Sequence, residues 1–323
     1  MSITNKISGS SFHTTKKSLL ILGLLSKIFY GDLIMAQEHL SLITTPIFLL
    51  KSDERISQGT GFFYSFFTPA GEEIIFLVTN YHVLTGNAPS EGKAPKGDQI
   101  AFYLHADSQN PENIVSMDLP LFTNKGEEVW IKSEKYPEAD VAVIPFSAFR
   151  FKAPKGITSL TISTISEKWI NDDIKIRPAS TITLIGYPYG FFDKSHWLPI
   201  WKTGNVASEP YFDFEGQPMF VADVSAFPGM SGSPVFAIFD GSYETASGGQ
   251  VISSGRSTTF LGIFASLQTV EEKLYLEEIS FTSGKGILLQ KSLELANVWK
   301  RSVLEDIFEN FDSEAYKAKL TEK

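Results

Sequence analysis

Short apolar or alternating runs, separated by turns that contain glycine and proline, fill most of the chain after residue 40. Regular short strands of this kind are typical of β-barrels or sandwiches and not of a parallel α/β fold. A first set of strands is predicted at Ile43–Leu50, Gly61–Phe67, Ile74–Thr79, Gln99–Leu104, Val129–Lys132 and Asp140–Pro145. After a crossover near Pro154, a second set is predicted at Ile174–Ile176, Thr181–Tyr187, Gly204–Ser208, Met219–Val224, Pro234–Phe239 and Phe260–Ala265.

The end of the chain changes to a helical spacing. From Gly286 to about Lys319, apolar residues recur at steps of three, four and seven, among them Leu289, Leu293 and Ile307. This is the period at which residues share one face of an α-helix. We therefore predict a helical tail over residues 286–323, after two sets of strands at residues 40–150 and 160–285.

The first 36 residues have two interpretations. Lys16 and Lys17 precede the apolar run Leu19–Leu25, as in a secretory signal that is cut after Ala36, which predicts export to the periplasm or secretion. Alternatively, translation starts at Met35 and the protein is cytoplasmic. The apolar run is too short to span a bilayer, so we expect no stable membrane anchor.

Composition and charge narrow the class of protein. A chain of 323 residues with 43% apolar residues can bury a sizeable core. The net charge of -9 and the absence of a basic stripe argue against a nucleic-acid partner. The chain has no cysteine, which excludes disulfides and thiolate metal sites but fits either the cytoplasm or the periplasm.

Ser231 is the strongest candidate for chemistry, because it lies between two glycines in the stretch Gly229–Pro234. Glycines let the backbone turn sharply and approach a substrate closely. A serine hydroxyl is a weak nucleophile at neutral pH, so it needs a histidine to take its proton and a carboxylate to orient that histidine. His82 follows an apolar run that predicts a buried strand, and Asp140 stands at the start of another predicted strand. The order His, Asp, Ser is one of those in which this triad recurs.

Each of these residues also has a purely structural interpretation. A serine between glycines is most often part of a turn, and an aspartate at the end of a strand is usually a cap. A lone histidine after a strand is usually structural. The other histidines stand in segments without catalytic context: His13, His39, His105 and His196.

Several segments in one order carry a family resemblance: Gln58–Phe63, Thr79–Val83, Ile185–Gly190, Thr203–Ser208, Ala222–Asp223 before Ser231, and Phe260–Ser266. Together they resemble the trypsin-like peptidases, nearest to the HtrA/DegP-like and V8-like bacterial branches. The resemblance implies an all-β, chymotrypsin-like fold of two antiparallel six-stranded β-barrels with a C-terminal helical tail. The residues after the second barrel are too few for the PDZ domain that HtrA-like proteins usually carry.

The resemblance also implies a serine endopeptidase that acts on a protein or peptide substrate without a metal or an organic cofactor. Ser231 would attack the carbonyl, His82 would transfer the proton and Asp140 would orient His82. The backbone N–H groups of Gly229 and Ser231 would form the oxyanion hole. Met230 stands where relatives carry Asp or Asn, which leaves open whether this loop is preset or ordered by the substrate.

The expected specificity pocket follows from family positions. Ser225 would lie near its base, and the strand residues Leu261, Gly262, Ile263 and Phe264 would border it. These positions hold no acid to bind Lys or Arg and no histidine to bind Glu. A small or apolar side chain before the cut is therefore expected.

Two other functions remain open at this stage. The first is a peptidase-like binding module without turnover, against which an intact triad argues. The second is an esterase or acyltransferase that uses the same serine. A Gly-x-Ser-x-Gly elbow needs a helix after the serine, whereas strands are predicted around Ser231. The oligomeric state is left open.

Overall fold

The structure is a computed structural model, and it describes residues 38–105, 113–149, 162–275 and 286–321; for 269–275 and 286–291 it describes the backbone alone. The N-terminal segment with two interpretations and the crossover near Pro154 lie outside the described residues. Residues His39–Lys323 form one compact unit.

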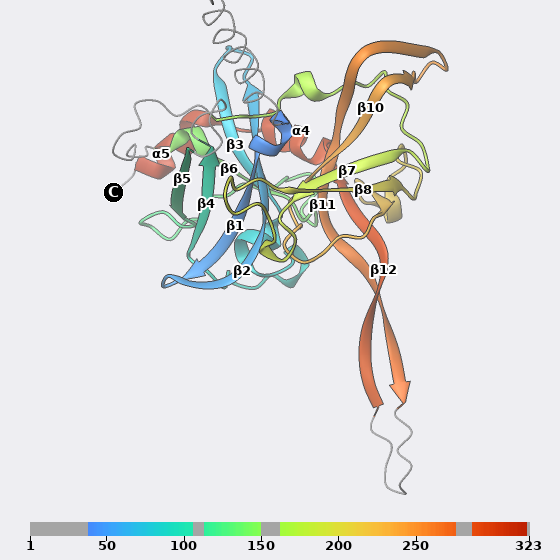
Figure 1. The fold of residues 1–323 in the computed structure, drawn as a ribbon. Helices are drawn as coiled ribbons and strands as arrows, with labels where there is room; N and C mark the ends of the chain where they lie inside the picture. Colours follow the sequence, from blue (N-terminus) through green and yellow to red (C-terminus); the bar gives the residue numbers. More distant parts are fainter. Residues whose placement is uncertain (1–37, 106–112, 150–161, 276–285, 322–323) are drawn as a thin grey trace, which may run out of the picture. The chain divides into compact units, whose positions relative to one another are not determined.

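The first half of this unit is a six-stranded antiparallel sheet with the order β5-β4-β1-β2-β3-β6 (Figure 1). Its strands are β1 Thr44–Lys51, β2 Glu54–Phe67, β3 Glu73–Thr79, β4 Gln99–His105, β5 Ile114–Pro120 and β6 Ala142–Pro145. The strand predicted at Val129–Lys132 is wrong, because this segment makes only an isolated bridge from Ile131 to Val143. The sixth strand is instead β5, which pairs with β4 along its whole length.

The second half is a closed barrel with the order β10-β11-β12-β9-β8-β7. Its strands are β7 Thr181–Gly186, β8 Ile200–Val206, β9 Met219–Asp223, β10 Pro234–Glu244, β11 Gln250–Tyr275 and β12 Gly286–Lys300. The segment predicted at Ile174–Ile176 makes only a bridge between Ile174 and Thr245. The expected all-β fold of two antiparallel six-stranded β-barrels is confirmed in its strand number and pairing, with the second half closed into a barrel and the first half forming a six-stranded sheet.

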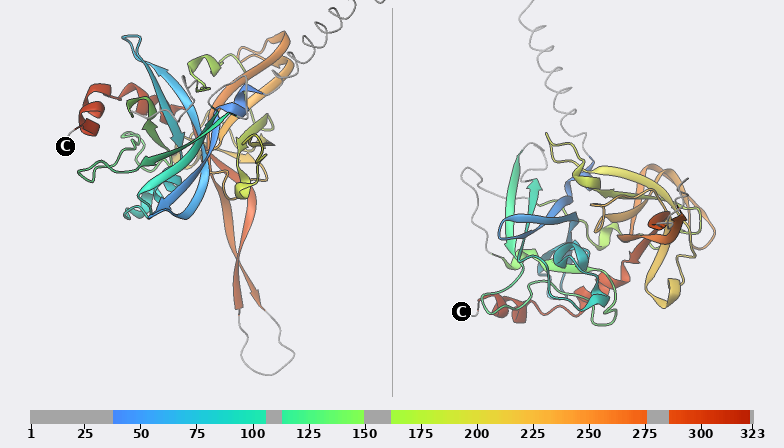
Figure 2. Two further views of the ribbon diagram at one scale, coloured as in Figure 1. Left: turned by 60° about the vertical axis from the view of Figure 1, so that its left-hand side comes forward. Right: turned by 90° about the horizontal axis from the view of Figure 1, so that it is seen from below.

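The helical prediction is wrong for Gly286–Lys300, which is strand β12, so the second barrel extends to Lys300 and not to residue 285. Its last residues alternate as a strand does, with Ala296 and Val298 fully buried and Asn297 between them half-buried. Helices begin only afterwards, at α4 Ser302–Glu309 and α5 Ser313–Thr321. Figure 2 shows β11 and β12 continuing beyond the barrel as a two-stranded ribbon.

Alternation along the strands fills two cores at once. In β3, Phe76 and Val78 point into a core shared by the two sheets, while Leu77 points into the core of the first sheet. In β10, Phe236 joins the shared core, while Val235 joins the core of the second barrel. Because both faces of these strands are buried, their sequences are nearly continuous apolar runs.

The C-terminal helices join the two halves. Helix α4 inserts its buried residues, among them Ile307 and Phe308, into the shared core. In α5, Tyr316 donates a hydrogen bond to the Val129 carbonyl at 2.6 Å. None of the helices in the described ranges has the length and the apolar character that crossing a membrane requires.

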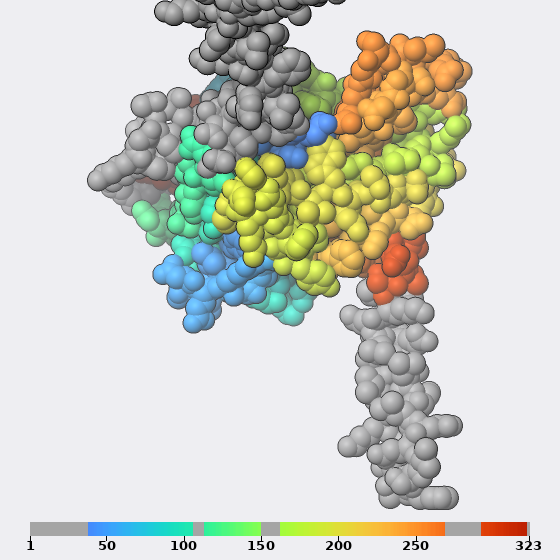
Figure 3. All heavy atoms as spheres, viewed as in Figure 1, coloured from blue at the N-terminus to red at the C-terminus, as the bar shows by residue number. Residues whose placement is uncertain are grey.

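The loop between β7 and β8 covers one face of the junction (Figure 3). Its Trp197 ring packs on Tyr103 of β4 with centroids 3.6 Å apart, and Phe192 packs on Trp197 at 5.0 Å. The loop therefore joins the second barrel to the first sheet by aromatic packing. The remaining short elements are α2 His39–Leu42, α3 Tyr81–Thr85 and the 3₁₀ turns Pro89–Glu91, Phe146–Ala148, Glu167–Trp169, Pro188–Gly190 and Phe214–Gly216.

Candidate active site

His82 lies in a one-turn helix at the end of a buried strand. Strand β3 ends at Thr79, and Asn80 has extended backbone angles before α3 begins at Tyr81. Gly86 ends the helix in the left-handed conformation with φ 76°, and its N–H donates to the His82 carbonyl. The ring of His82 thus projects from the rim of the first sheet.

Asp140 is brought to His82 by strand pairing. Asp140 stands two residues before β6, and β6 pairs with β3 so that Ala142 lies opposite Thr79. One carboxylate oxygen of Asp140 accepts the backbone N–H of His82 at 2.9 Å, and the other lies 2.5 Å from His82 Nδ1. This geometry assigns the proton to Nδ1 and leaves Nε2 as the acceptor.

Asn80 holds the backbone of Asp140. Its side-chain amide donates to the Asp140 carbonyl at 2.5 Å, and the residue is fully buried. The amide oxygen of Asn80 has no hydrogen-bond partner among the described residues. A buried acceptor without a partner is unfavourable, so Asn80 is retained at a cost to stability while it orients the segment that carries Asp140.

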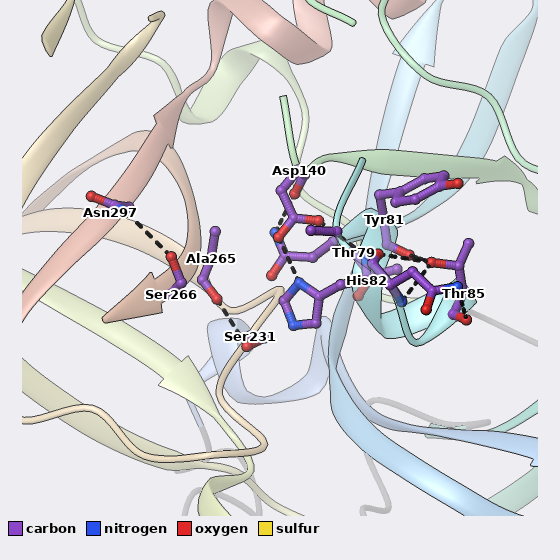
Figure 4. A network of polar contacts seen from close by, with 12 residues as sticks. Thr79, Tyr81, His82, Thr85, Asp140, Ser231, Ala265, Ser266 and Asn297 are labelled. Carbon is purple, nitrogen blue, oxygen red and sulfur yellow. Dashed lines mark hydrogen bonds and ion pairs between the residues drawn. The ribbon is translucent and has the colours of Figure 1, made fainter. Parts of the chain in front are cut away.

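Ser231 lies in the loop between β9 and β10, and Figure 4 shows it beside the ring of His82 on the side away from Asp140. Its hydroxyl donates to the Ala265 carbonyl at 2.9 Å and not to His82. Gly229 and Gly232 have φ values of 96° and 89°, which favour glycine. Because a serine hydroxyl turns about a single bond, rotation can redirect it toward His82.

One cleft of about 660 Å³ contains all three residues of the expected triad. Its ionisable lining residues are His82, Glu138 and Asp140, all from the first half. The second half contributes neutral residues: Phe227, Pro228, Ser231, Phe264, Ala265, Ser266, Leu267, Asn297 and Trp299. The cleft thus brings the ionisable residues of the first half next to Ser231 of the second half.

Of the expected pocket residues, Phe264 alone lines this cleft. Ile263 is fully buried in the shared core, and Leu261 borders a different cavity near Arg301. Gly262 packs against the backbone of β12, and Ser225 is half-buried outside the cleft lining.

The wall lies further along β11 and on β12. Ser266 accepts a hydrogen bond from the side-chain amide of Asn297 at 3.2 Å, and Gln268 donates to the Asn297 oxygen at 2.9 Å. Asn297 and Trp299 of this wall were missed because their strand was predicted as a helix. The alternation of Ala296, Asn297 and Val298 is the signal that could have revealed it.

The loop before Ser231 is anchored by Met230, whose side chain is fully buried in the core of the second barrel. The Met230 N–H donates to the Phe227 carbonyl at 3.1 Å. The N–H groups of Gly229 and Ser231 have no hydrogen-bond partner within the described part of the chain. In this structure, which contains no substrate, Met230 thus attaches the loop to the barrel core.

Among the described side chains, no group of three or more His, Cys, Asp or Glu residues lies close enough together to hold a metal ion.

A family model for the trypsin-like peptidase domain matches residues 59–242, a range that contains His82, Asp140 and Ser231. This chain belongs to the trypsin-like peptidase domain family. The predicted resemblance to the trypsin-like peptidases is thereby confirmed.

Solved structures similar to this peptidase chain share little sequence with it. One is a serine endoprotease from Yersinia pestis, with 14% identity over 84% of this chain and a TM-score of 0.39. This chain spans 64% of the length of that protein. A thermostable serine protease, AL20, from an extremophilic microorganism has 12% identity over 84% of this chain and 98% of its own, with a TM-score of 0.41.

A further similar structure is an inactivated protease paralogue of the scabies mite, with 15% identity over 84% of this chain and 97% of its own, and a TM-score of 0.38. No curated protein matches the chain in sequence. The family match and the side chains of the cleft are therefore the features that indicate what the protein does.

Proposed function

We propose that this chain is a serine endopeptidase that hydrolyses peptide bonds through Ser231, His82 and Asp140. The observation that carries the proposal is the pairing of His82 Nδ1 with Asp140 in the cleft that also contains Ser231. This pairing leaves Nε2 of His82 as a base on the side of the serine. A binding module without turnover has no need of an oriented imidazole.

The reaction proceeds in two halves. Ser231 Oγ attacks the scissile carbonyl carbon while its proton passes to His82 Nε2, and the carbonyl oxygen becomes an oxyanion that the N–H groups of Gly229 and Ser231 bind. The C–N bond then breaks as His82 gives the proton to the leaving amine, which leaves an acyl-enzyme on Ser231. Water, deprotonated by His82, attacks this ester and releases the acid and the free serine.

The wall of the cleft favours a neutral side chain before the cut. Ser266 and Asn297 present a hydroxyl and an amide, and the second half contributes no charged residue to the lining. A charged substrate side chain would lose its hydration here without gaining an opposite charge. We therefore infer a small or neutral residue at this position, which broadens the small or apolar residue expected from the sequence, because the wall offers polar contacts.

Activity-based labelling tests the proposal directly. The full chain is treated with a fluorophosphonate probe and, in parallel, with a peptide library, and Ser231→Ala serves as the control. We expect labelling at Ser231 and cleavage after neutral residues, both lost in the control. A folded protein that neither reacts with the probe nor cleaves peptides would favour the binding module, and turnover of esters without peptides would favour the esterase.

A further inference from the structure

We infer that Thr60 is a positioning residue for catalysis, whose buried hydroxyl holds the backbone around Gly229 so that the oxyanion hole is formed before the substrate arrives. The inference rests on the proposed function, since it assigns a task in the same reaction. Thr60 lies on β2 of the first sheet, far from Gly229 in sequence. Its role is therefore a link between the two halves of the molecule.

The Thr60 hydroxyl both donates and accepts a hydrogen bond. It donates to the Gly229 carbonyl at 2.8 Å and accepts the backbone N–H of Tyr187 at 3.1 Å, and the residue is fully buried. Its own backbone N–H donates to the Ser231 carbonyl at 2.8 Å. One residue thus bonds the carbonyl groups of both proposed oxyanion-hole residues and the strand end that lies next to them.

A peptide unit is planar, so a hydrogen bond to the carbonyl of one residue also fixes the direction of the N–H group of the next residue. The Tyr189 N–H donates to the Pro228 carbonyl at 2.6 Å, and the Gly229 N–H belongs to the same peptide unit. The next unit, Gly229–Met230, is held by Thr60 at its carbonyl and by Phe227 at its N–H. Gly229, with φ 96°, stands between two units that are both held.

These hydrogen bonds are needed because residue 229 is a glycine. A residue without Cβ samples positive and negative φ about equally, so an unheld Gly229 could rotate its N–H away from the substrate oxygen. Removal of the Thr60 hydroxyl leaves the Gly229 carbonyl and the Tyr187 N–H without partners. The Gly229–Met230 peptide unit then loses its link to the first sheet, while the side chain of Met230 stays in the barrel core.

The test compares Thr60→Val, Thr60→Ser and Thr60→Ala with a matched control, Thr45→Val. Thr45 is also a buried threonine of the first sheet whose hydroxyl contacts two backbone groups, the Pro46 carbonyl at 3.3 Å and the Tyr103 N–H at 2.9 Å. It does not line the cleft. Thermal unfolding of every variant separates loss of fold from loss of positioning, and Thr60→Ala replaces Thr60→Val if the latter does not fold.

We expect Thr60→Val to lower kcat about tenfold to a hundredfold with KM nearly unchanged, which is less than the loss of a whole oxyanion donor. Affinity for a peptide boronate, which mimics the tetrahedral oxyanion, falls by the same factor, while affinity for a product peptide is retained. Thr60→Ser restores both, and Thr45→Val resembles the wild type in kcat and boronate affinity.

Wild-type kcat and boronate affinity in folded Thr60→Val, or in Thr60→Ala where the former does not fold, would overturn the inference. Equal losses in Thr60→Ser and Thr60→Val, or in Thr45→Val and Thr60→Val, would also overturn it, because the effect would then not depend on the hydroxyl at this site. Failure of the proposed function looks different: the wild type itself would not react with the fluorophosphonate.

Discussion

The two sides of the cleft hold their reactive groups in different ways. On the first sheet, His82 is fixed by two hydrogen bonds to Asp140, one from its backbone and one from its ring. On the second barrel, the backbone of Ser231 is fixed, whereas its hydroxyl is bonded to Ala265 and not to His82. The proposed base is therefore oriented in advance, and the proposed nucleophile needs one bond rotation to reach it.

The difference follows from how each side is built. Pairing of β3 with β6 brings His82 and Asp140 together, so their contact is a consequence of sheet register. The serine loop is shaped by two glycines at positive φ and by the buried Met230. A regular sheet can therefore orient a base, whereas presenting a nucleophile and two free N–H groups requires irregular backbone.

The largest expected effect tests whether the two sides act as one unit. Ser231→Ala should lower kcat by a factor on the order of 10⁶, and adding His82→Ala should then cost little more. Single-turnover and steady-state peptide hydrolysis of the single and double variants measure this. Losses that multiply instead would show that the two residues do not share a step.

A second prediction concerns only the serine loop of the second barrel. In Gly229→Ala, the new Cβ would lie 2.5 Å from the Tyr187 carbonyl oxygen and 2.8 Å from the Gln58 side chain, so the loop must shift. We expect kcat to fall by about 10²–10³, as when an oxyanion donor is lost. Gly71→Ala is the matched control, because Gly71 has a φ of 82° but no atom within 4 Å of the added Cβ. Similar kcat losses in both variants would point to backbone strain instead.

The third prediction concerns the side of the cleft that belongs to the first sheet. Asn80→Ala removes the hydrogen bond to the Asp140 carbonyl, so Asp140 and His82 are less well aligned, and we expect kcat to fall roughly tenfold to a hundredfold. The low-field NMR signal of the His82 Nδ1 proton should weaken or broaden. An unchanged signal together with unchanged kcat would mean that strand pairing alone holds Asp140.

The smallest effect is expected at the junction of the two sides. The buried hydroxyl of Tyr187 lies 3.1 Å from the Thr44 carbonyl and 3.2 Å from the Trp197 carbonyl, and burial raises the pKa of Tyr187, so that it stays protonated. Tyr187→Phe leaves these carbonyls without this donor and should lower the free energy of unfolding by about 1–3 kcal/mol. Urea unfolding measures the change, and wild-type stability would contradict it.

Much of the site could be predicted because it depends on short motifs. The glycines around Ser231 and the histidine that follows β3 are visible in the sequence, and strand pairing brings the segments together. The overlooked strand β5 was also within reach of sequence analysis, since Val115, Met117 and Leu119 are buried in strict alternation with exposed residues. Alternation of this kind is the signal of a half-buried strand.

Strand β12 was harder to predict for a physical reason. Glu294 has a positive φ of 59°, and the pairing of β11 with β12 shifts register between Leu267 and Thr269. The irregularity breaks the two-residue period and leaves a spacing that also fits a helix. The alternation at Ala296, Asn297 and Val298 covers too few residues to outweigh this spacing, and most of the support for a strand comes from pairing with β9 and β11 in the closed barrel.

The apolar anchor at Met230 has a consequence for how such a protein is controlled. A side chain without charge does not respond to protons or to salt, and one that is fully enclosed by a barrel does not leave it unless the barrel opens. Folding of the barrel therefore also places Met230, so the attachment of the serine loop to the core is independent of pH and of ionic strength. A signal that acts through charge would have to reach the loop by another contact, such as the hydrogen bonds that Thr60 makes to Gly229 and Ser231.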